Sequence, residues 1–95
     1  EGKKNYILKI LSDRKNNITS RDPKGVASTY EMVINVKVEV FYNDINTPIA
    51  TFVINKNSNY KNQINKFSLS QYKNTIEENI IREIAQEITI KLQSL

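Results

Sequence analysis

The sequence predicts an α+β fold in which a long C-terminal helix packs on an antiparallel or mixed β-sheet. Apolar and polar residues alternate over Tyr30–Tyr42, which is the pattern of a long half-buried strand. A second strand-like run, Ile49–Asn55, follows after a short turn, so the two runs predict an antiparallel hairpin. Isoleucine and leucine then recur every four residues from Ile76 to Leu92, as on one face of a helix. We expect residues 1–95 to form a single domain.

A further short strand is predicted at Tyr6–Leu11, where the apolar run YILKIL is strongly β-capable. The next segment, Ser12–Val26, is polar and holds the turn signals Asp22-Pro23 and Gly25. We therefore expect Ser12–Val26 to be a loop of mixed charge.

The hairpin is predicted to have one apolar face. In Tyr30–Tyr42 the even-numbered residues are apolar, and Val33 and Phe41 interrupt the polar face. Asn43–Thr47 is expected to form the hairpin loop, and Pro48 is expected to begin the next strand, where its missing N–H is tolerated.

The basic stretch Lys56–Lys73, KNSNYKNQINKFSLSQYK, is predicted to begin as a loop and to end as the start of the helix. Ser68 and Gln71 have the spacing of a capping box, and Phe67 and Tyr72 have the spacing of a hydrophobic staple. The resulting helix of about 25 residues would be roughly 37 Å long. A sheet covered by one helix has an open edge and little core, so we expect a further strand and helix, or a partner, to complete the core.

The composition favours a binding role over an enzymatic one. The chain has no His, the commonest general base and metal ligand, and no Cys. Its two glycines form no glycine-rich phosphate loop. We expect no catalytic residues, no metal and no cofactor. The net charge of +4 and the pI near 9.4 suit an anionic partner such as nucleic acid or a phosphorylated lipid.

Two basic segments are candidate anion-binding sites. The first holds Arg14, Lys15, Arg21 and Lys24, and the second holds Lys56, Lys61, Lys66 and Lys73, interleaved with Tyr60, Phe67 and Tyr72. Rings and ammonium groups together suit single-stranded nucleic acid or a phosphorylated lipid. A third interpretation is that the rings close the end of the core while the lysines are merely hydrated. The sequence leaves open whether the two segments share an end of the domain.

The run ASTYEMVINV at Ala27–Val36 resembles the central strand of the LPS-assembly lipoproteins, the LptE family, which have a similar stretch after a glycine turn, here Gly25. The resemblance extends over most of Ile18–Leu92, since its further matching features stand in the same order. They are Asp44-Ile45 and Pro48-Ile49 at the hairpin, the Asn- and aromatic-containing segment Tyr60–Phe67, and the helix end Ala85–Leu92.

The resemblance implies two helices on a four-stranded sheet, whose first strand and helix precede the matched part. It also implies a non-enzymatic subunit on the periplasmic side of the bacterial outer membrane, held by an N-terminal lipid anchor that this chain does not include. Such a subunit plugs the LptD β-barrel, helps it to assemble and binds lipopolysaccharide; nucleic acid is not expected as a partner.

The resemblance also implies site residues. Family positions linked to lipopolysaccharide binding match Pro23 and Gln71 here, so the role is expected to pass to neighbouring cations. The expected lipopolysaccharide-binding residues are Arg21, Lys24, Lys66 and Lys73, and the expected partner contacts are Val33, Phe41 and Tyr60. Two alternatives stay open: a small basic nucleic-acid-binding module, and a periplasmic protein-interaction domain without a lipid ligand.

Overall fold

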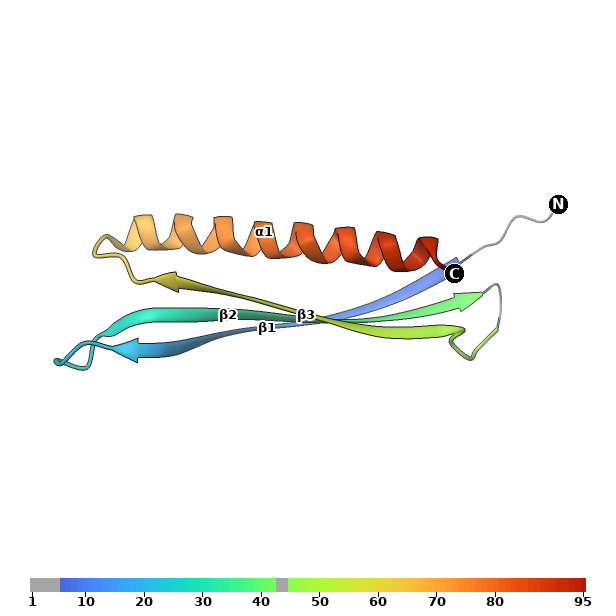
Figure 1. The fold of residues 1–95 in the computed structure, drawn as a ribbon, viewed down its shortest axis with the longest axis horizontal. Helices are drawn as coiled ribbons and strands as arrows, with labels where there is room; N and C mark the ends of the chain where they lie inside the picture. Colours follow the sequence, from blue (N-terminus) through green and yellow to red (C-terminus); the bar gives the residue numbers. More distant parts are fainter. Residues whose placement is uncertain (1–5, 43–44) are drawn as a thin grey trace.

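Residues 6–42 and 45–95 are described by the structure, a computed structural model. Three strands, β1 (Tyr6–Arg21), β2 (Ala27–Tyr42) and β3 (Ala50–Lys61), form an antiparallel sheet in the order β1-β2-β3. One helix, α1 (Lys66–Gln93), lies along one face of the sheet over β3 and β2 (Figure 1). The predicted α+β fold, with a helix on an antiparallel sheet, is confirmed.

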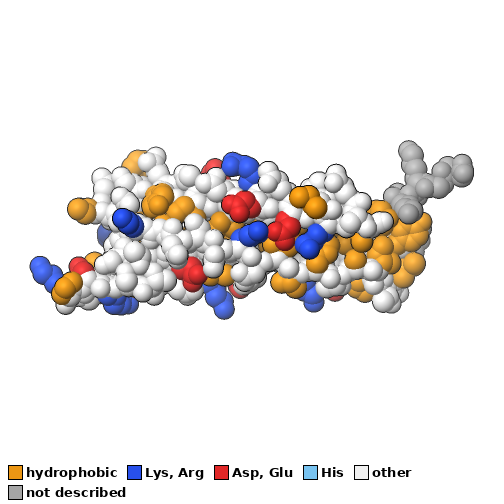
Figure 2. All heavy atoms as spheres, in the orientation of Figure 1, with side chains coloured by type: hydrophobic (Ala, Val, Ile, Leu, Met, Phe, Trp, Pro, Cys, Tyr) orange, Lys and Arg blue, Asp and Glu red, His pale blue; other side chains and the backbone are white. Residues whose placement is uncertain are grey.

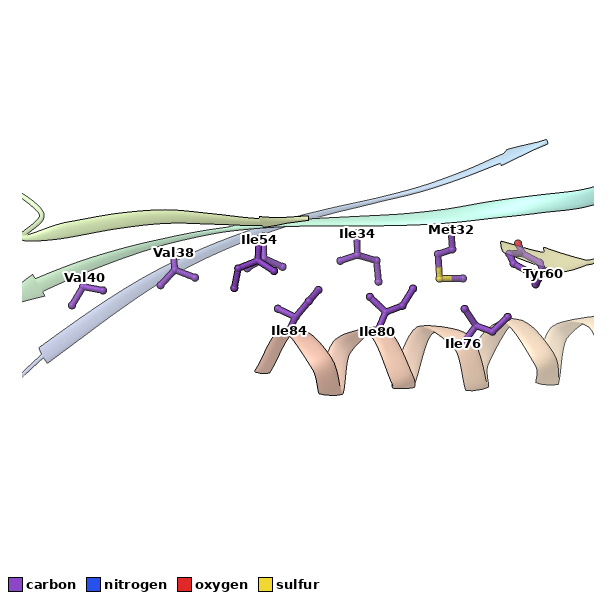
Figure 3. Close-up of a cluster of buried hydrophobic side chains, with 10 residues drawn as sticks. Met32, Ile34, Val38, Val40, Ile54, Tyr60, Ile76, Ile80 and Ile84 are labelled. Carbon is purple, nitrogen blue, oxygen red and sulfur yellow. The ribbon is translucent and has the colours of Figure 1, made fainter. Parts of the chain in front are cut away.

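The core lies between the even-numbered face of β2 and the apolar face of α1. Side chains of Met32, Ile34, Val36, Val38 and Val40 alternate along β2 and point toward the helix, as the period of two predicts. They meet Ile54 and Tyr60 of β3 and Ile76, Ile80 and Ile84 of α1 (Figure 3). Burying one such aliphatic side chain is worth about 1.5–3 kcal/mol, so this single layer of contacts is the main source of stability.

β1 is longer than the sequence predicts. A strand was expected at Tyr6–Leu11 with a loop from Ser12 to Val26, but the strand continues to Arg21. Its polar half pairs with β2, with Asp13 opposite Asn35 and Asn17 opposite Glu31. The sequence shows no alternation over the second half of β1 because this strand is exposed on both faces. Its backbone hydrogen bonds to β2 hold it in place instead.

β3 is also longer than predicted, because Lys56–Lys61 belongs to the strand and not to a loop. Lys56 lies on the helix-facing side, opposite Ile34, where its ammonium group is 3.0 Å from a carboxylate oxygen of Glu87. The preceding loop was predicted at Asn43–Thr47, and residues 43–44 of it lie outside the described residues. Pro48 precedes the strand, which begins at Ala50.

The helix begins earlier than the capping box predicts. Asn65 is the N-cap, and its side-chain oxygen accepts hydrogen bonds from the backbone N–H groups of Phe67 (2.8 Å) and Ser68 (3.2 Å). Ser68 is therefore already inside the helix. An Asn cap satisfies two of the free N–H groups of the first turn, so the Ser68–Gln71 box is not needed. The helix has 28 residues, close to the expected length.

Candidate functional site

Both loops at one end of the molecule are joined by hydrogen bonds. Asn62, in the β3–α1 loop, donates its backbone N–H to the carbonyl of Ser28 (2.9 Å) and its side-chain N–H to the carbonyl of Ala27 (2.8 Å). The β1–β2 turn and the β3–α1 loop therefore lie side by side at the same end of the sheet (Figure 1). We call this region the basic end: Arg21–Val26 together with Asn62–Phe67.

The β1–β2 turn of the basic end is rigidly built. The Asp22 carboxylate accepts hydrogen bonds of 2.9 Å from the backbone N–H groups of Lys24 and Val26. Gly25 has a φ of +86°, in the left-handed region where a side chain is strained. Pro23 presets the second turn position. The turn thus holds the Lys24 side chain out on a fixed backbone.

Three of the four predicted lipid-binding cations belong to the basic end. Arg21 is the last residue of β1, Lys24 is on the turn and Lys66 is the first residue of α1, and all three are exposed. The guanidinium of Arg21 also donates to the carbonyl of Gly25 over 2.8 Å. Figure 2 shows Lys and Arg side chains projecting at this end of the molecule. Lys73 is about two helical turns further along, roughly 10 Å from Lys66, so it extends the cationic surface along the helix.

Exposed apolar side chains lie among these cations. Val26, Ile64 and Phe67 are 55 %, 106 % and 69 % exposed. A hollow of about 520 Å³ lies between the two loops and is lined by residues that include Asp22, Val26, Ile64 and Lys66. Sequence reasoning identified the cations and the ring of Phe67 but not Val26 and Ile64, because their exposure depends on how the loops fold. The basic end therefore offers both ammonium groups and apolar contact.

The electrostatics of the basic end favour an anion beside α1. The first turn of α1 contains no acidic residue, so the positive end of its dipole is not offset within the helix. Lys66 adds a full positive charge at the same point. Asp22 is the acidic group in the hollow, and one of its oxygens already accepts the two turn hydrogen bonds.

Tyr60 belongs to the core and not to a contact surface. Its side chain is 2 % exposed, stacked on Tyr30 with ring centroids 5.2 Å apart and edge-on to Tyr72 at 6.0 Å. Its hydroxyl donates to Asn16 over 2.9 Å, and burial raises the pKa of this phenol above its ordinary value. The expected partner contact at Tyr60 is corrected, because a buried ring offers no surface. The interpretation in which the tyrosines close the core holds for this residue.

The other two expected partner contacts lie on the sheet face away from the helix. Val33 and Phe41 are odd-numbered residues of β2, and both are half-buried. Phe41 stands opposite Ile7 of β1, and Val53 of β3 is 64 % exposed on the same face. Apolar side chains are thus present on this face but separated by polar ones.

A groove beside α1 was not predicted. It measures about 300 Å³ and lies between the helix and β1, with Ile10 on one side and Ile81 and Ile88 on the other. The ion pair Arg14–Glu77, 2.6 Å between nitrogen and oxygen, joins the two elements across it. The sequence feature that indicates this groove is Ile81. It makes the apolar face of the helix wider than the part that packs on β2 and β3.

The described part of the chain contains no helix with the length and apolar character that crossing a bilayer requires. No protein-family model and no curated protein sequence matches this chain.

Proposed function

We propose that this protein is a non-enzymatic subunit of lipopolysaccharide assembly at the bacterial outer membrane, similar in role to the LptE family. In this role it binds lipopolysaccharide through the basic end and associates with an LptD-like β-barrel. One observation carries the proposal: exposed cations and exposed apolar side chains lie together on two loops that Asn62 joins.

An amphiphile with phosphates beside acyl chains is the ligand class that matches this arrangement. Ammonium and guanidinium groups of Lys24, Lys66 and Arg21 give charge-assisted hydrogen bonds to phosphate oxygens. Val26, Ile64 and Phe67 supply apolar surface within the same region. A purely polar polyanion would use the cations and leave these apolar side chains in water.

The barrel partner is proposed for the sheet face that carries Val33 and Phe41. Val33 and Phe41 share this face with the exposed side chains of Ile7, Leu11 and Val53, and apolar residues on a sheet face without a helix suit a surface that is covered on association. Attachment through a lipid anchor upstream of the described residues is part of the same proposal, and so is the periplasmic location.

Burial of Tyr60 weakens the nucleic-acid alternative. A single-stranded nucleic acid needs exposed rings on which successive bases stack. Tyr60 is buried, and Phe67 is the strongly exposed ring of the three, at 69 %. The basic end therefore offers a less continuous stacking platform than the sequence alone indicated.

The test is binding of the domain to purified lipopolysaccharide, measured by fluorescence anisotropy across a salt series, with single-stranded RNA in parallel. The variant Lys24→Ala/Lys66→Ala removes two cations of the basic end. Its matched control is Lys15→Ala/Lys37→Ala, which removes the same charge from the sheet. A third variant, Ile64→Ser/Phe67→Ser, removes apolar surface and keeps every charge.

Support is saturable lipopolysaccharide binding that weakens in the Lys24/Lys66 and Ile64/Phe67 variants and is retained in the sheet control. Equal and steeply salt-dependent binding to lipopolysaccharide and RNA, insensitive to Ile64 and Phe67, would mean non-specific charge attraction and overturn the lipid role. The barrel role is tested separately, by co-purification with an LptD-like barrel and its loss on Phe41→Lys.

A further inference from the structure

The two edge strands of the sheet differ in a way that points to a partner. β3 alternates in the manner of an outer strand, since Asn55, Asn57 and Asn59 occupy the face away from the helix. The first half of β1 is apolar on both faces. Leu8 and Ile10 stand on the helix side and Ile7 and Leu11 on the opposite side, each between 37 % and 56 % exposed. Strands that are apolar on both faces normally lie inside a sheet.

β1 has one neighbour, β2, so its outer edge presents unpaired backbone N–H and C=O groups. The edge lacks the usual protection, because β1 contains neither proline nor glycine and pairs without interruption from Tyr6 to Ile18. Its charged residues sit toward the polar half, apart from Lys9. A strand that pairs with this edge would satisfy these backbone groups and flank the apolar half of β1.

The charges of β1 select a second copy of β1 in one register. In an antiparallel pair of identical strands, outward-facing backbone groups meet only when even residues stand opposite even residues. Centring the pair on Leu11 sets Lys9 of each copy opposite Asp13 of the other, and Asp13 is the only acidic residue of β1. Registers centred on Lys9, Asp13, Arg14 or Lys15 set like charges against themselves.

Two other registers also pair Asp13 with a cation. Centring on Arg14 sets Asp13 opposite Lys15, but it sets Arg14 against itself. Centring on Asn17 sets Asp13 opposite Arg21, but it leaves the apolar residues Tyr6–Leu11 outside the paired region. The register centred on Leu11 pairs Tyr6–Asn16 of each copy, so it sets Lys9 opposite Asp13 and Leu11 opposite Leu11 and places the apolar half inside the joined sheet. The two Lys9–Asp13 pairs and the Leu11–Leu11 pair both stabilise the joined sheet, while Leu8 and Ile7 pack against the aliphatic stems of Arg14 and Lys15.

We propose that two copies of this chain associate through β1, antiparallel and centred on Leu11, to form one continuous six-stranded sheet. Lys9 then lies between Glu39 of its own β2 and Asp13 of the other copy. The two helices lie on the same face of the joined sheet. This interface is independent of the basic end, so it stands or fails apart from the lipid role.

A cysteine cross-link tests the register directly, since residues 1–95 contain no Cys. In the proposed dimer the two Leu11 residues face each other, and opposite Cβ atoms about 5 Å apart are close to the span of a disulfide. The variant is Leu11→Cys, equilibrated in a glutathione redox buffer and followed on non-reducing gels. Its matched control is Val53→Cys, because Leu11, Lys37 and Val53 form one row across the same sheet face.

A charge exchange tests the same interface at equilibrium by analytical ultracentrifugation. Asp13→Arg replaces two opposite-charge pairs by two like-charge pairs, so we expect the dimer to weaken about tenfold or more. Lys9→Glu should weaken it similarly, and the double variant Lys9→Glu/Asp13→Arg should restore it. If either substitution weakened the dimer by unfolding the monomer, the double variant would be weak as well. Recovery of the dimer in the double variant therefore shows that the single variants act at the interface.

The expected results are a disulfide dimer with Leu11→Cys, little with Val53→Cys, and recovery of the dimer in the double variant. A chain that is monomeric at high micromolar concentration overturns the proposal. So does equal cross-linking of the two cysteine variants, and so does a double variant that remains as weak as the single ones. Circular dichroism of each variant confirms that the comparison is made between folded proteins.

Discussion

The side-chain amide of Asn62 donates to the carbonyl of Ala27 over 2.8 Å, between residues 35 positions apart in the sequence. The backbone N–H of Asn62 donates to Ser28 as well, so one residue satisfies two carbonyls of the β1–β2 hairpin. Asn62 therefore ties the two basic loops together beyond the last strand pair, Thr29–Lys61.

Asn62→Ala should lower the free energy of unfolding by about 1 kcal/mol, because it leaves the part-buried carbonyl of Ala27 without that donor. Urea denaturation measures the change. Gln63→Ala is the control, since the side chain of Gln63 makes only a long contact of 3.4 Å to Lys61. If the two variants unfold at the same urea concentration, the Asn62 bond does not hold the loops together.

Asn65→Ala should cost about 0.5–2 kcal/mol of stability, because it removes the acceptor for two N–H groups of the first turn of α1. Ser68→Ala should change stability much less, since Ser68 lies within the helix and alanine is the better helix former. Thermal and urea unfolding of the two variants measure which residue stabilises the start of the helix, Asn65 or Ser68. A larger loss with Ser68→Ala would restore the capping box that the sequence predicted.

The sequence predicts the parts of this fold in which burial imposes a period. β2 and α1 each place one face against the other, so their apolar residues recur every two and every four positions. The same logic failed for the second halves of β1 and β3. There the backbone pairs with β2 while most side chains are polar and, Tyr60 apart, at least partly exposed, so the residue types do not distinguish strand from loop.

The candidate site was predictable in its charges and not in its shape. Arg21, Lys24 and Lys66 are visible as cations in the sequence, but their convergence follows from the unexpected length of β1 and β3. β1 pairs along β2 as far as Ala27 and β3 pairs as far as Thr29, so both connections come to one end of the sheet. Tyr60 was expected at the surface but is in the core, because β3 extends to Lys61 and Tyr60 lies on its helix-facing side.

Ile80→Ala should lower the free energy of unfolding by about 2–5 kcal/mol, because Ile80 is 3 % exposed and its loss leaves a cavity in a thin core. Ile81→Ala should cost clearly less, since Ile81 is 50 % exposed beside the groove. The two neighbours share one helix and one chemistry, so helix propensity cancels between them. Chemical denaturation gives both values, and comparable losses would mean that the groove is filled in solution.

Lys56 and Glu87 should show a coupling of about 0.2–1 kcal/mol in a double-mutant cycle with alanine. Both side chains are about one-third exposed, so solvent screens the pair, and high salt should reduce the coupling further. The free energy of unfolding of the four proteins is measured with denaturant, with and without 1 M salt. At 1 M salt the Debye length is roughly 3 Å, so charge attraction is strongly screened. A coupling that salt does not change would point to packing of the lysine stem instead of charge attraction.

Alkaline stability should depend on Tyr60. Burial raises the pKa of its phenol above the ordinary value of 10.0, Tyr30 raises it further, and Arg14 acts in the opposite direction. Because the folded-state pKa exceeds the unfolded one, the unfolded chain releases this proton first. The contribution of Tyr60 is therefore fully present below the unfolded pKa and is lost as the pH rises through the folded pKa.

The measurement is the free energy of unfolding at a series of pH values between about 8 and 12, the range around the tyrosine pKa. Tyr60→Phe should unfold more easily at neutral pH, because the bond to Asn16 is lost, and should lose stability less steeply as the pH rises. Asn16→Ala removes the same bond and keeps the phenol, so it separates the two effects. If Tyr60→Phe and the natural chain show parallel curves, the phenol does not titrate differently on folding, and tyrosinate absorbance should then show the hydroxyl ionising in the folded protein at its ordinary pKa.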